Sequence, residues 1–235
     1  MKKLQVLLLS TLIASPAVAL ADSNLEFYGK AGIPGVGVGV GAGVHDKVSV
    51  RADITTLGSI SRDFKQNKIE YTAKVKATQG TIAIDYFPMT NSSFRLTTGV
   101  GMGRIKIDGE GRSTRPNGTI KIGGKSYSYD SSQDFVNAKI EYPDLMPYFG
   151  IGLGHNAKAK QAGSWGFNAD LGVYVGDPKT SFQVSDSLYE KMLLANGNDA
   201  AATAADIESE RQRVKDKAGD LRVVPVASVG FSYYF

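Results

Sequence analysis

Residues 165–175 read WGFNADLGVYV, and this stretch decides the fold. Apolar side chains occupy every second position from Trp165 to Val175, which is the period of a β-strand. The positions between them hold small Gly residues mixed with single polar side chains such as Asp170. A soluble β-sandwich also alternates, but its polar face is solvated and its apolar face meets a second sheet. Tiny residues mixed with isolated charges suit the crowded interior of a narrow barrel instead.

Two more stretches alternate in the same way. Residues 48–55 read VSVRADIT, and residues 36–44 read VGVGVGAGV, with Gly at every second position. The glycine run has the GxGxG spacing of phosphate-binding loops. It lies within a strand pattern rather than between a strand and a helix, so we do not expect it to bind phosphate.

The last seven residues, 229–235, read VGFSYYF and place Val229, Phe231, Tyr233 and Phe235 on one face. Soluble domains usually end in polar, frayed residues. An alternating aromatic strand ending in Phe resembles the assembly signal that bacterial outer-membrane barrels present to their insertion machinery. The aromatic side chains would also form the periplasmic girdle of such a barrel.

The first 21 residues have the three parts of a secretory signal peptide. Lys2 and Lys3 precede a mostly apolar run over 4–13, and Ala19-Leu20-Ala21 fits the small-x-small cleavage rule. The alternative is a membrane anchor, but the run is shorter than the roughly 20 residues that a helix needs to span a bilayer. We therefore expect cleavage between Ala21 and Asp22, a mature domain over 22–235, and export through the inner membrane of a Gram-negative bacterium. Loss of both lysines lowers the formal net charge from +4 to +2, and no long basic run suggests nucleic-acid binding.

Composition excludes several chemistries. The 235 residues contain no cysteine, which excludes disulfides, thiol catalysis and thiolate metal sites. His45 and His155 are the only histidines, so we expect neither a metal nor another cofactor. The 27 Gly, and the 21 Tyr and Phe against one Trp, favour β-structure over helix.

The sequence predicts an all-β fold: an eight-stranded antiparallel transmembrane up-and-down β-barrel with a helical segment in the last extracellular loop. Short turns are expected at the inner end and longer connections at the outer end. Bulges are expected near 79–80, Gly103 and 143–147, where the alternation slips. The predicted strands are 24–33, 36–44, 47–58, 68–87, 93–107, 135–153, 164–176 and 220–235. The predicted inner turns are 45–46, 88–92 and 156–163, and the outer connections are 34–35, 59–67, 108–134 and 177–219.

Two outer loops have structure of their own. Residues 119–127 predict a hairpin on a Gly123-Gly124 turn. It would raise the count to ten if it entered the membrane, but its strands are too short to span, so we expect it above the barrel. Residues 200–218, rich in Ala, Glu, Arg and Lys and ending at Gly219, predict a helix with Glu208–Arg211 and Glu210–Arg213 pairs. With few large apolar residues it is expected to lie loosely on the barrel rim, the alternative being a lid or partner-binding helix.

Eight side chains are candidates to line the interior. Eight strands give a bore that side chains can fill, so their mixed charges could pair and plug it. The alternative is an open channel. The last loop, 177–220, carries nine acids against six bases, and a negative mouth would concentrate cations. The candidate lumen-lining residues are Glu26, Lys30, Arg51, Asp53, Asp85, Arg95, Asp170 and Tyr174.

The sequence does not favour an enzyme. Small outer-membrane barrels that catalyse reactions place a histidine near the outer leaflet, whereas His45 and His155 fall at inner turns. Asp53 and Asp85 could act as acid and base, but interior ion pairs with Arg51 and Arg95 are the favoured interpretation.

Several motifs suggest a family. Gly123–Tyr127 (GGKSY), Pro147–Gly152 (PYFGIG), Trp165–Phe167 with Asp170–Tyr174 (WGF, DLGVY) and Gly176–Lys179 (GDPK) occur in order. A charged helical stretch, Val224-Pro225-Val226 and the aromatic terminus follow. This pattern resembles the carbapenem-associated, ornithine-porin-like group of small outer-membrane barrels, and the likeness is strongest from residue 120 onward. The resemblance implies an eight-stranded barrel and a role in uptake of basic amino acids.

The sequence thus leaves two functions open. One is passage of small solutes such as basic amino acids; the other is a closed barrel with a structural, adhesive or envelope-stabilising role. The expected partners are the outer-membrane bilayer and its lipopolysaccharide, the barrel assembly machinery and periplasmic chaperones. No nucleic-acid partner is expected.

Overall fold

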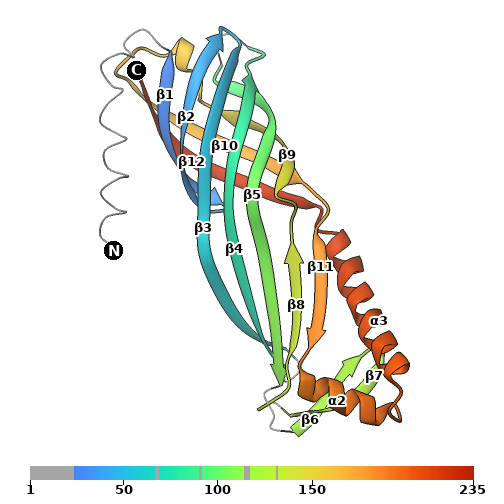
Figure 1. Ribbon diagram of the computed structural model, residues 1–235. Helices are drawn as coiled ribbons and strands as arrows, with labels where there is room; N and C mark the ends of the chain where they lie inside the picture. Colours follow the sequence, from blue (N-terminus) through green and yellow to red (C-terminus); the bar gives the residue numbers. More distant parts are fainter. Residues whose placement is uncertain (1–23, 67–68, 90–91, 114–116, 131) are drawn as a thin grey trace, which may run out of the picture.

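The computed structural model describes residues 24–66, 69–89, 92–113, 117–130 and 132–235. The signal peptide predicted for residues 1–21, with its cleavage site at Ala21 and Asp22, lies outside the described residues. Eight antiparallel strands form a closed ring, as the sequence predicts: β12 pairs with β1, and β5 pairs with β9 (Figure 1). The ring consists of β1 (Leu25–Ile33), β2 (Val36–His45), β3 (Val48–Gln66), β4 (Ile69–Tyr86), β5 (Phe94–Ser113), β9 (Leu145–Leu153), β10 (Trp165–Val175) and β12 (Val223–Tyr234).

The outer surface of the ring is apolar. Along β10, for example, Trp165, Phe167 and Leu171 are exposed while Asn168 and Asp170 are buried. Contiguous apolar surface of this extent is unfavourable in water and is stable against lipid. We call this surface the lipid belt. It includes Phe27, Val38, Val40, Val50, Ile54, Ile82, Ile84, Leu96, Val100, Met102, Leu145, Phe149, Ile151, Phe167, Leu171, Val229 and Phe231.

Neither described helix is apolar enough over a sufficient length to cross a membrane.

Beyond the lipid belt, strands β3, β4 and β5 continue as an extension of the sheet (Figure 1). The outer parts of β3, β4 and β5 remain paired, β8 (Val136–Glu141) pairs with β5, and β11 (Lys179–Val184) pairs with β8. The expected outer loop 59–67 is therefore wrong, because β3 runs on to Gln66 after a register shift between Thr56 and Gly58. The strand expected over 135–153 is two strands, separated at Pro143-Asp144. The β4–β5 register continues without a shift through Gly80 and Gly103, where we expected bulges.

The hydrophobic pattern inverts where the extension begins. Within the belt, Ile82 and Ile84 of β4 are exposed, and Thr81 and Asp85 are buried. In the extension, Ala77 and Ile105 are buried on the inner face, while the neighbouring Lys76 and Arg104 point outward. Lipid lies outside the belt and water outside the extension, so the same strands need opposite patterns in their two halves.

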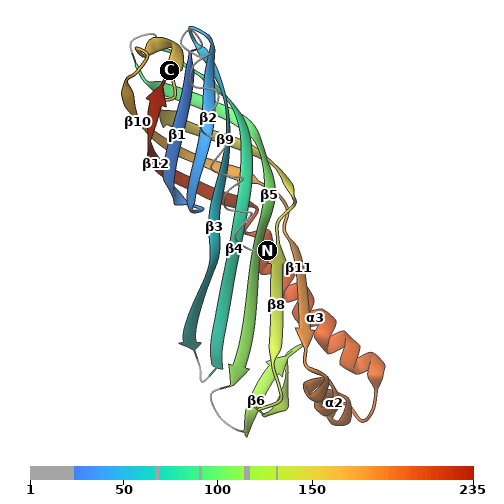
Figure 2. The same ribbon diagram turned by 60° about the vertical axis from the view of Figure 1, so that its left-hand side comes forward.

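A hairpin and a short helix lie at the far end of the extension, and a longer helix runs back alongside it toward the ring (Figure 2). The hairpin consists of β6 (Asn117–Ile122) and β7 (Lys125–Asp130), joined at Gly123-Gly124 with positive φ at both residues. It forms its own two-stranded sheet outside the ring, as predicted. Helix α2 (Asp186–Ala195) follows β11, and α3 (Ala200–Gly219) follows α2. A short 3₁₀ turn, η1 (Ala157–Ala159), lies at the opposite end of the ring.

A second apolar core holds these elements together. Tyr127 and Tyr129 of β7 pack with Leu188 and Met192 of α2, and Ile207 of α3 packs against them. The predicted helix and both of its ion pairs are confirmed. Its expected loose position on the rim is wrong, because α3 lies along β11 and β6 and buries Thr203, Asp206 and Ala218. We call the hairpin and both helices the outer cap.

Candidate functional site

Four charged side chains form a closed network inside the ring. Arg51 Nε lies 2.7 Å from Asp85 Oδ2, and Arg51 Nη2 lies 2.9 Å from Asp170 Oδ1. Arg95 contacts the same two carboxylates, through Nη1 at 2.9 Å and Nη2 at 2.6 Å. Strands β3 and β10 are not neighbours in the ring, so the Arg51–Asp170 contact crosses the bore. Each cation bridges both anions, and all four are buried.

A second ion pair lies beside this network. Lys30 Nζ contacts Asp53 Oδ1 at 2.8 Å, and the Tyr28 hydroxyl donates to Asp53 Oδ2 at 2.9 Å. The expected pairing of Asp53 with an arginine is thus wrong, whereas that of Asp85 is right. Asp53 is two residues farther along β3 than Arg51, and the guanidinium of Arg51 reaches across to Asp170 instead.

The two histidines lie at the end of the ring that holds the C-terminus. His155 is fully buried, its Nδ1 lies 2.7 Å from Glu26 Oε1, and its ring packs against Tyr28 at 4.3 Å. His45 is exposed at the end of β2.

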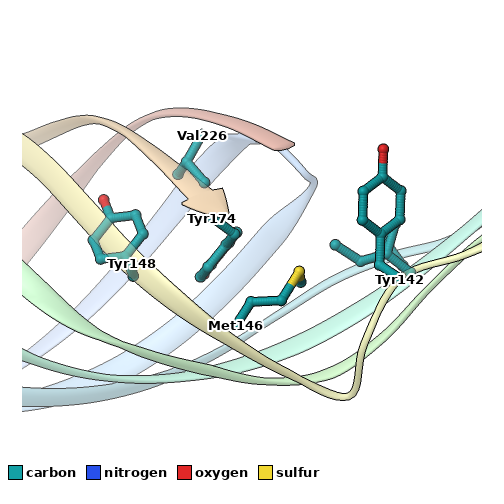
Figure 3. Close-up of a cluster of buried hydrophobic side chains, with 7 residues drawn as sticks. Tyr142, Met146, Tyr148, Tyr174 and Val226 are labelled. Carbon is teal, nitrogen blue, oxygen red and sulfur yellow. The ribbon is translucent and has the colours of Figure 1, made fainter. Parts of the chain in front are cut away.

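A cluster of buried side chains, most of them apolar, packs at the other end of the bore. Met146, Tyr148 and Tyr174 are almost fully buried and pack with Val226 and Tyr142 (Figure 3). The Tyr174 hydroxyl and Thr81 Oγ1 lie 2.6 Å apart, which ties β10 to β4 across the ring. We call this group the mouth cluster. It also includes Ala77 and Ile105.

Six of the eight candidate lumen residues are buried, and the side chains of the other two, Lys30 and Asp53, are 8% and 2% exposed. All eight are joined by ion pairs or hydrogen bonds to other interior groups. Tyr174, which bonds Thr81, also belongs to the mouth cluster. Sequence reasoning missed Tyr28, Met146 and His155. Tyr28 could have been found, because it lies on the same strand face as Glu26 and Lys30.

The four residues of the expected assembly signal lie on the lipid side of β12. Phe231 and Val229 are exposed, and Tyr233 packs against Trp165 at a ring distance of 5.2 Å. Phe167 faces Phe231, and Phe235 stacks edge-on to Tyr233 at 5.0 Å. These rings form an aromatic girdle at one edge of the belt.

A buried polar centre joins the elements of the outer cap. Asp206 of α3 accepts hydrogen bonds from Tyr127 Oη at 2.5 Å, Lys125 Nζ at 2.9 Å and Asn196 Nδ2 at 3.0 Å. Burial raises the pKa of Asp206, but these donors outweigh burial and hold that pKa below its usual value. Because Asp206 thereby joins α3 to β7 and to the end of α2, it fixes the geometry of the cap.

The chain was compared with known proteins. No family model and no curated protein matches the sequence. The fold matches the crystal structure of Acinetobacter baumannii CarO2 with a TM-score of 0.61 and 16% identity, covering 90% of this chain and 98% of that chain. It matches Acinetobacter baumannii CarO with a TM-score of 0.57 and 16% identity, covering 89% and 97%. This chain therefore has the eight-stranded barrel fold of the carbapenem-associated outer-membrane proteins that its motifs resemble.

Proposed function

We propose that this protein is an outer-membrane β-barrel whose bore is closed and whose barrel anchors the extension and the outer cap at the cell surface. In this role the extension works outside the membrane as a structural, adhesive or envelope-stabilising platform. The observation that carries the proposal is the crossed network of Arg51, Arg95, Asp85 and Asp170, which joins opposite sides of the bore.

Electrostatics favours a closed bore. Separating a buried cation from its partner leaves an uncompensated charge in low dielectric, which costs roughly 3–5 kcal/mol. A solute passing this level would have to break several such contacts at once. The mouth cluster blocks the same path with Met146, Tyr148 and Tyr174.

Three features support the location. The lipid belt surrounds the ring, the aromatic girdle marks one edge of the belt, and the amino-terminal sequence has the pattern of an export signal. The outer membrane of a Gram-negative bacterium is where such exported barrels reside. Assembly there would use periplasmic chaperones and the barrel assembly machinery.

A second candidate function is passage of small solutes such as basic amino acids, which the motif resemblance implies. One observation favours it: the side-chain amide of Gln79 is fully buried without a hydrogen-bond partner among the described residues. Buried polar groups of this kind commonly bind water. A hydrated interior would let ion pairs exchange partners with a cationic solute.

Single-channel recording separates the two candidates. The refolded mature chain is placed in a planar bilayer under a potassium chloride gradient, and folding is verified by the heat-dependent shift on a gel. A silent bilayer supports the closed barrel. Discrete cation-selective steps, followed by flux of ornithine into vesicles, support solute passage and contradict the closed bore.

A further inference from the structure

The part of the outward face of the extension nearest the lipid belt is basic, whereas the next row outward carries Glu110 of β5 and Asp63 of β3. In the rows of paired residues that cross β4, β5, β8 and β11 next to the belt, six side chains on this face are cationic and two are carboxylates. We call this surface the basic face. It consists of Lys74, Lys76, Arg104, Lys106, Lys139 and Lys179, with Asp108 and Glu141.

The cations are arranged in cross-strand rows. Lys76 of β4 is directly opposite Lys106 of β5, Lys106 is opposite Glu141, and Glu141 is opposite Lys179. Like charges directly opposite each other destabilise a sheet unless an anion lies between them. The ion pairs on this face join Lys106 to Glu141 at 2.6 Å and Lys139 to Asp108 at 3.7 Å. Among the residues that the structure describes, Lys76 and Arg104 have no ion-pair partner.

The basic face continues the lipid belt directly. On β5, Met102 is exposed in the belt, and Arg104 is the next residue on the same side of the strand. At about 3.3 Å per residue and a strand tilt of about 40°, Arg104 lies about 5 Å beyond Met102 along the membrane normal, and Lys106 about 10 Å beyond it. The headgroup layer extends about 5–8 Å beyond the hydrocarbon on each side. Arg104 therefore falls at headgroup level, and the Lys76–Lys106 pair lies about 2–5 Å beyond that layer.

The other side of the extension is unavailable for this role. Ala77 and Ile105 pack into the mouth cluster there, and Phe182 of β11 packs against the same apolar core as Ile207 of α3. Arg104, Lys76, Lys139 and Lys179 are exposed. The charged side is thus the one that faces the surrounding membrane surface.

We propose that the basic face binds the phosphate groups of the anionic glycolipid that fills the outer leaflet, lipopolysaccharide. The proposal rests on the membrane location proposed above and names the partner of the extension. Phosphate oxygens would lie between Lys76 and Lys106 and against Arg104, which offers a planar fork of donors. The repulsion within the Lys76–Lys106 pair is then offset by a ligand that the membrane itself supplies.

Binding of lipopolysaccharide to the refolded chain in phosphatidylcholine vesicles tests the proposal. The probes are lipopolysaccharide with its phosphates intact, the same material after dephosphorylation, and inorganic phosphate alone. The test variant combines Lys76→Gln, Arg104→Gln and Lys106→Gln. The matched control removes the same charge from the exposed side of α3 through Arg211→Gln, Lys215→Gln and Lys217→Gln.

Each charge removed from the basic face should weaken binding of the phosphorylated probe about fivefold, or about a hundredfold for three, whereas the α3 control should bind like the wild type. Equal affinity for the dephosphorylated probe, equal loss in the α3 control, or equally tight binding of inorganic phosphate would overturn the proposal. If the triple variant does not fold, Arg104→Gln alone carries the fivefold expectation. Insertion into the vesicles, read from the gel shift, reports separately on the membrane location.

Discussion

At the scale of single residues, the interior depends on shared partners. Arg51 and Arg95 each contact both Asp85 and Asp170, and Thr97 donates a further hydrogen bond to Asp85 at 2.6 Å. When one of several donors to a carboxylate is removed, the remaining donors still stabilise part of its negative charge. Water cannot take the place of the missing donor, because each of these carboxylates is buried.

Replacement of Arg95 by methionine should lower the free energy of unfolding by about 3–5 kcal/mol, because Asp85 and Asp170 keep their charges with one fewer cation. Urea unfolding in vesicles, followed by fluorescence of Trp165, the single tryptophan, measures the change. Arg213→Met on exposed α3 removes the partner of Glu210 and should cost less than about 1 kcal/mol. Equal losses in both variants would show that the interior is wet.

The sequence predicts which side chains point into the barrel, but not which of them form ion pairs with one another. Period-two alternation places Asp53 and Arg51 on the same side of β3. Which cation reaches Asp53 depends on how far each strand is staggered along the barrel, and no local pattern encodes that stagger. Lys30 is the partner for this reason.

At the scale of elements, the hairpin of the outer cap depends on two glycines with different surroundings. Both have positive φ, +60° at Gly123 and +87° at Gly124. A Cβ on Gly123 would lie 2.6 Å from the Cα of Asp206, whereas a Cβ on Gly124 would meet nothing within 4 Å. The first glycine is therefore needed for both the turn and the contact with α3.

Gly123→Ala should loosen α3 from the hairpin, and Gly124→Ala should not. Both variants bear the cost of a left-handed alanine, about 1–2 kcal/mol, but only Gly123→Ala adds overpacking of about 1–3 kcal/mol. Hydrogen exchange of the α3 amides measures the difference. The same exchange rates in both variants would mean that the close approach of Gly123 and Asp206 does not hold the cap together.

Strands within the belt were easier to predict than elements beyond it. Strands in contact with lipid must alternate between outward apolar residues and inward small or polar residues along their whole length. The strands Val36–His45 and Trp165–Val175 follow this alternation, and both match their predicted bounds closely. Ser59, Ser61 and Asp63 resembled a loop because the pattern inverts after the register shift in β3. Helix α2 was missed, although Ser185 is its N-cap and Leu188 and Met192 supply its buried face.

At the scale of the whole molecule, the barrel and the outer parts are stabilised differently. The ring has a polar, ion-paired interior and an apolar exterior. The outer cap has an apolar interior and a polar exterior, as a water-soluble domain does. The mouth cluster lies where the two arrangements meet.

Phe235→Asp should lower the amount of protein in the outer membrane severalfold while changing the stability of the refolded barrel little. A charge near the edge of the lipid face costs only about 0–1 kcal/mol, so a larger effect in cells reports on assembly. Quantitative blotting of outer-membrane fractions, beside urea unfolding of the refolded variant, separates the two effects. Phe235→Leu serves as the control, and a normal outer-membrane level for Phe235→Asp would contradict the assembly role.

The pairing of β1 with β12 has a consequence for biosynthesis. The ring closes only when residues 25–33 meet residues 223–234, which are synthesised after the other seven strands of the ring. A prematurely terminated product would keep two unpaired strand edges, which are prone to aggregation and proteolysis. Ring closure therefore acts as a proofreading step: only a chain that includes β12 can hide its strand edges and escape degradation.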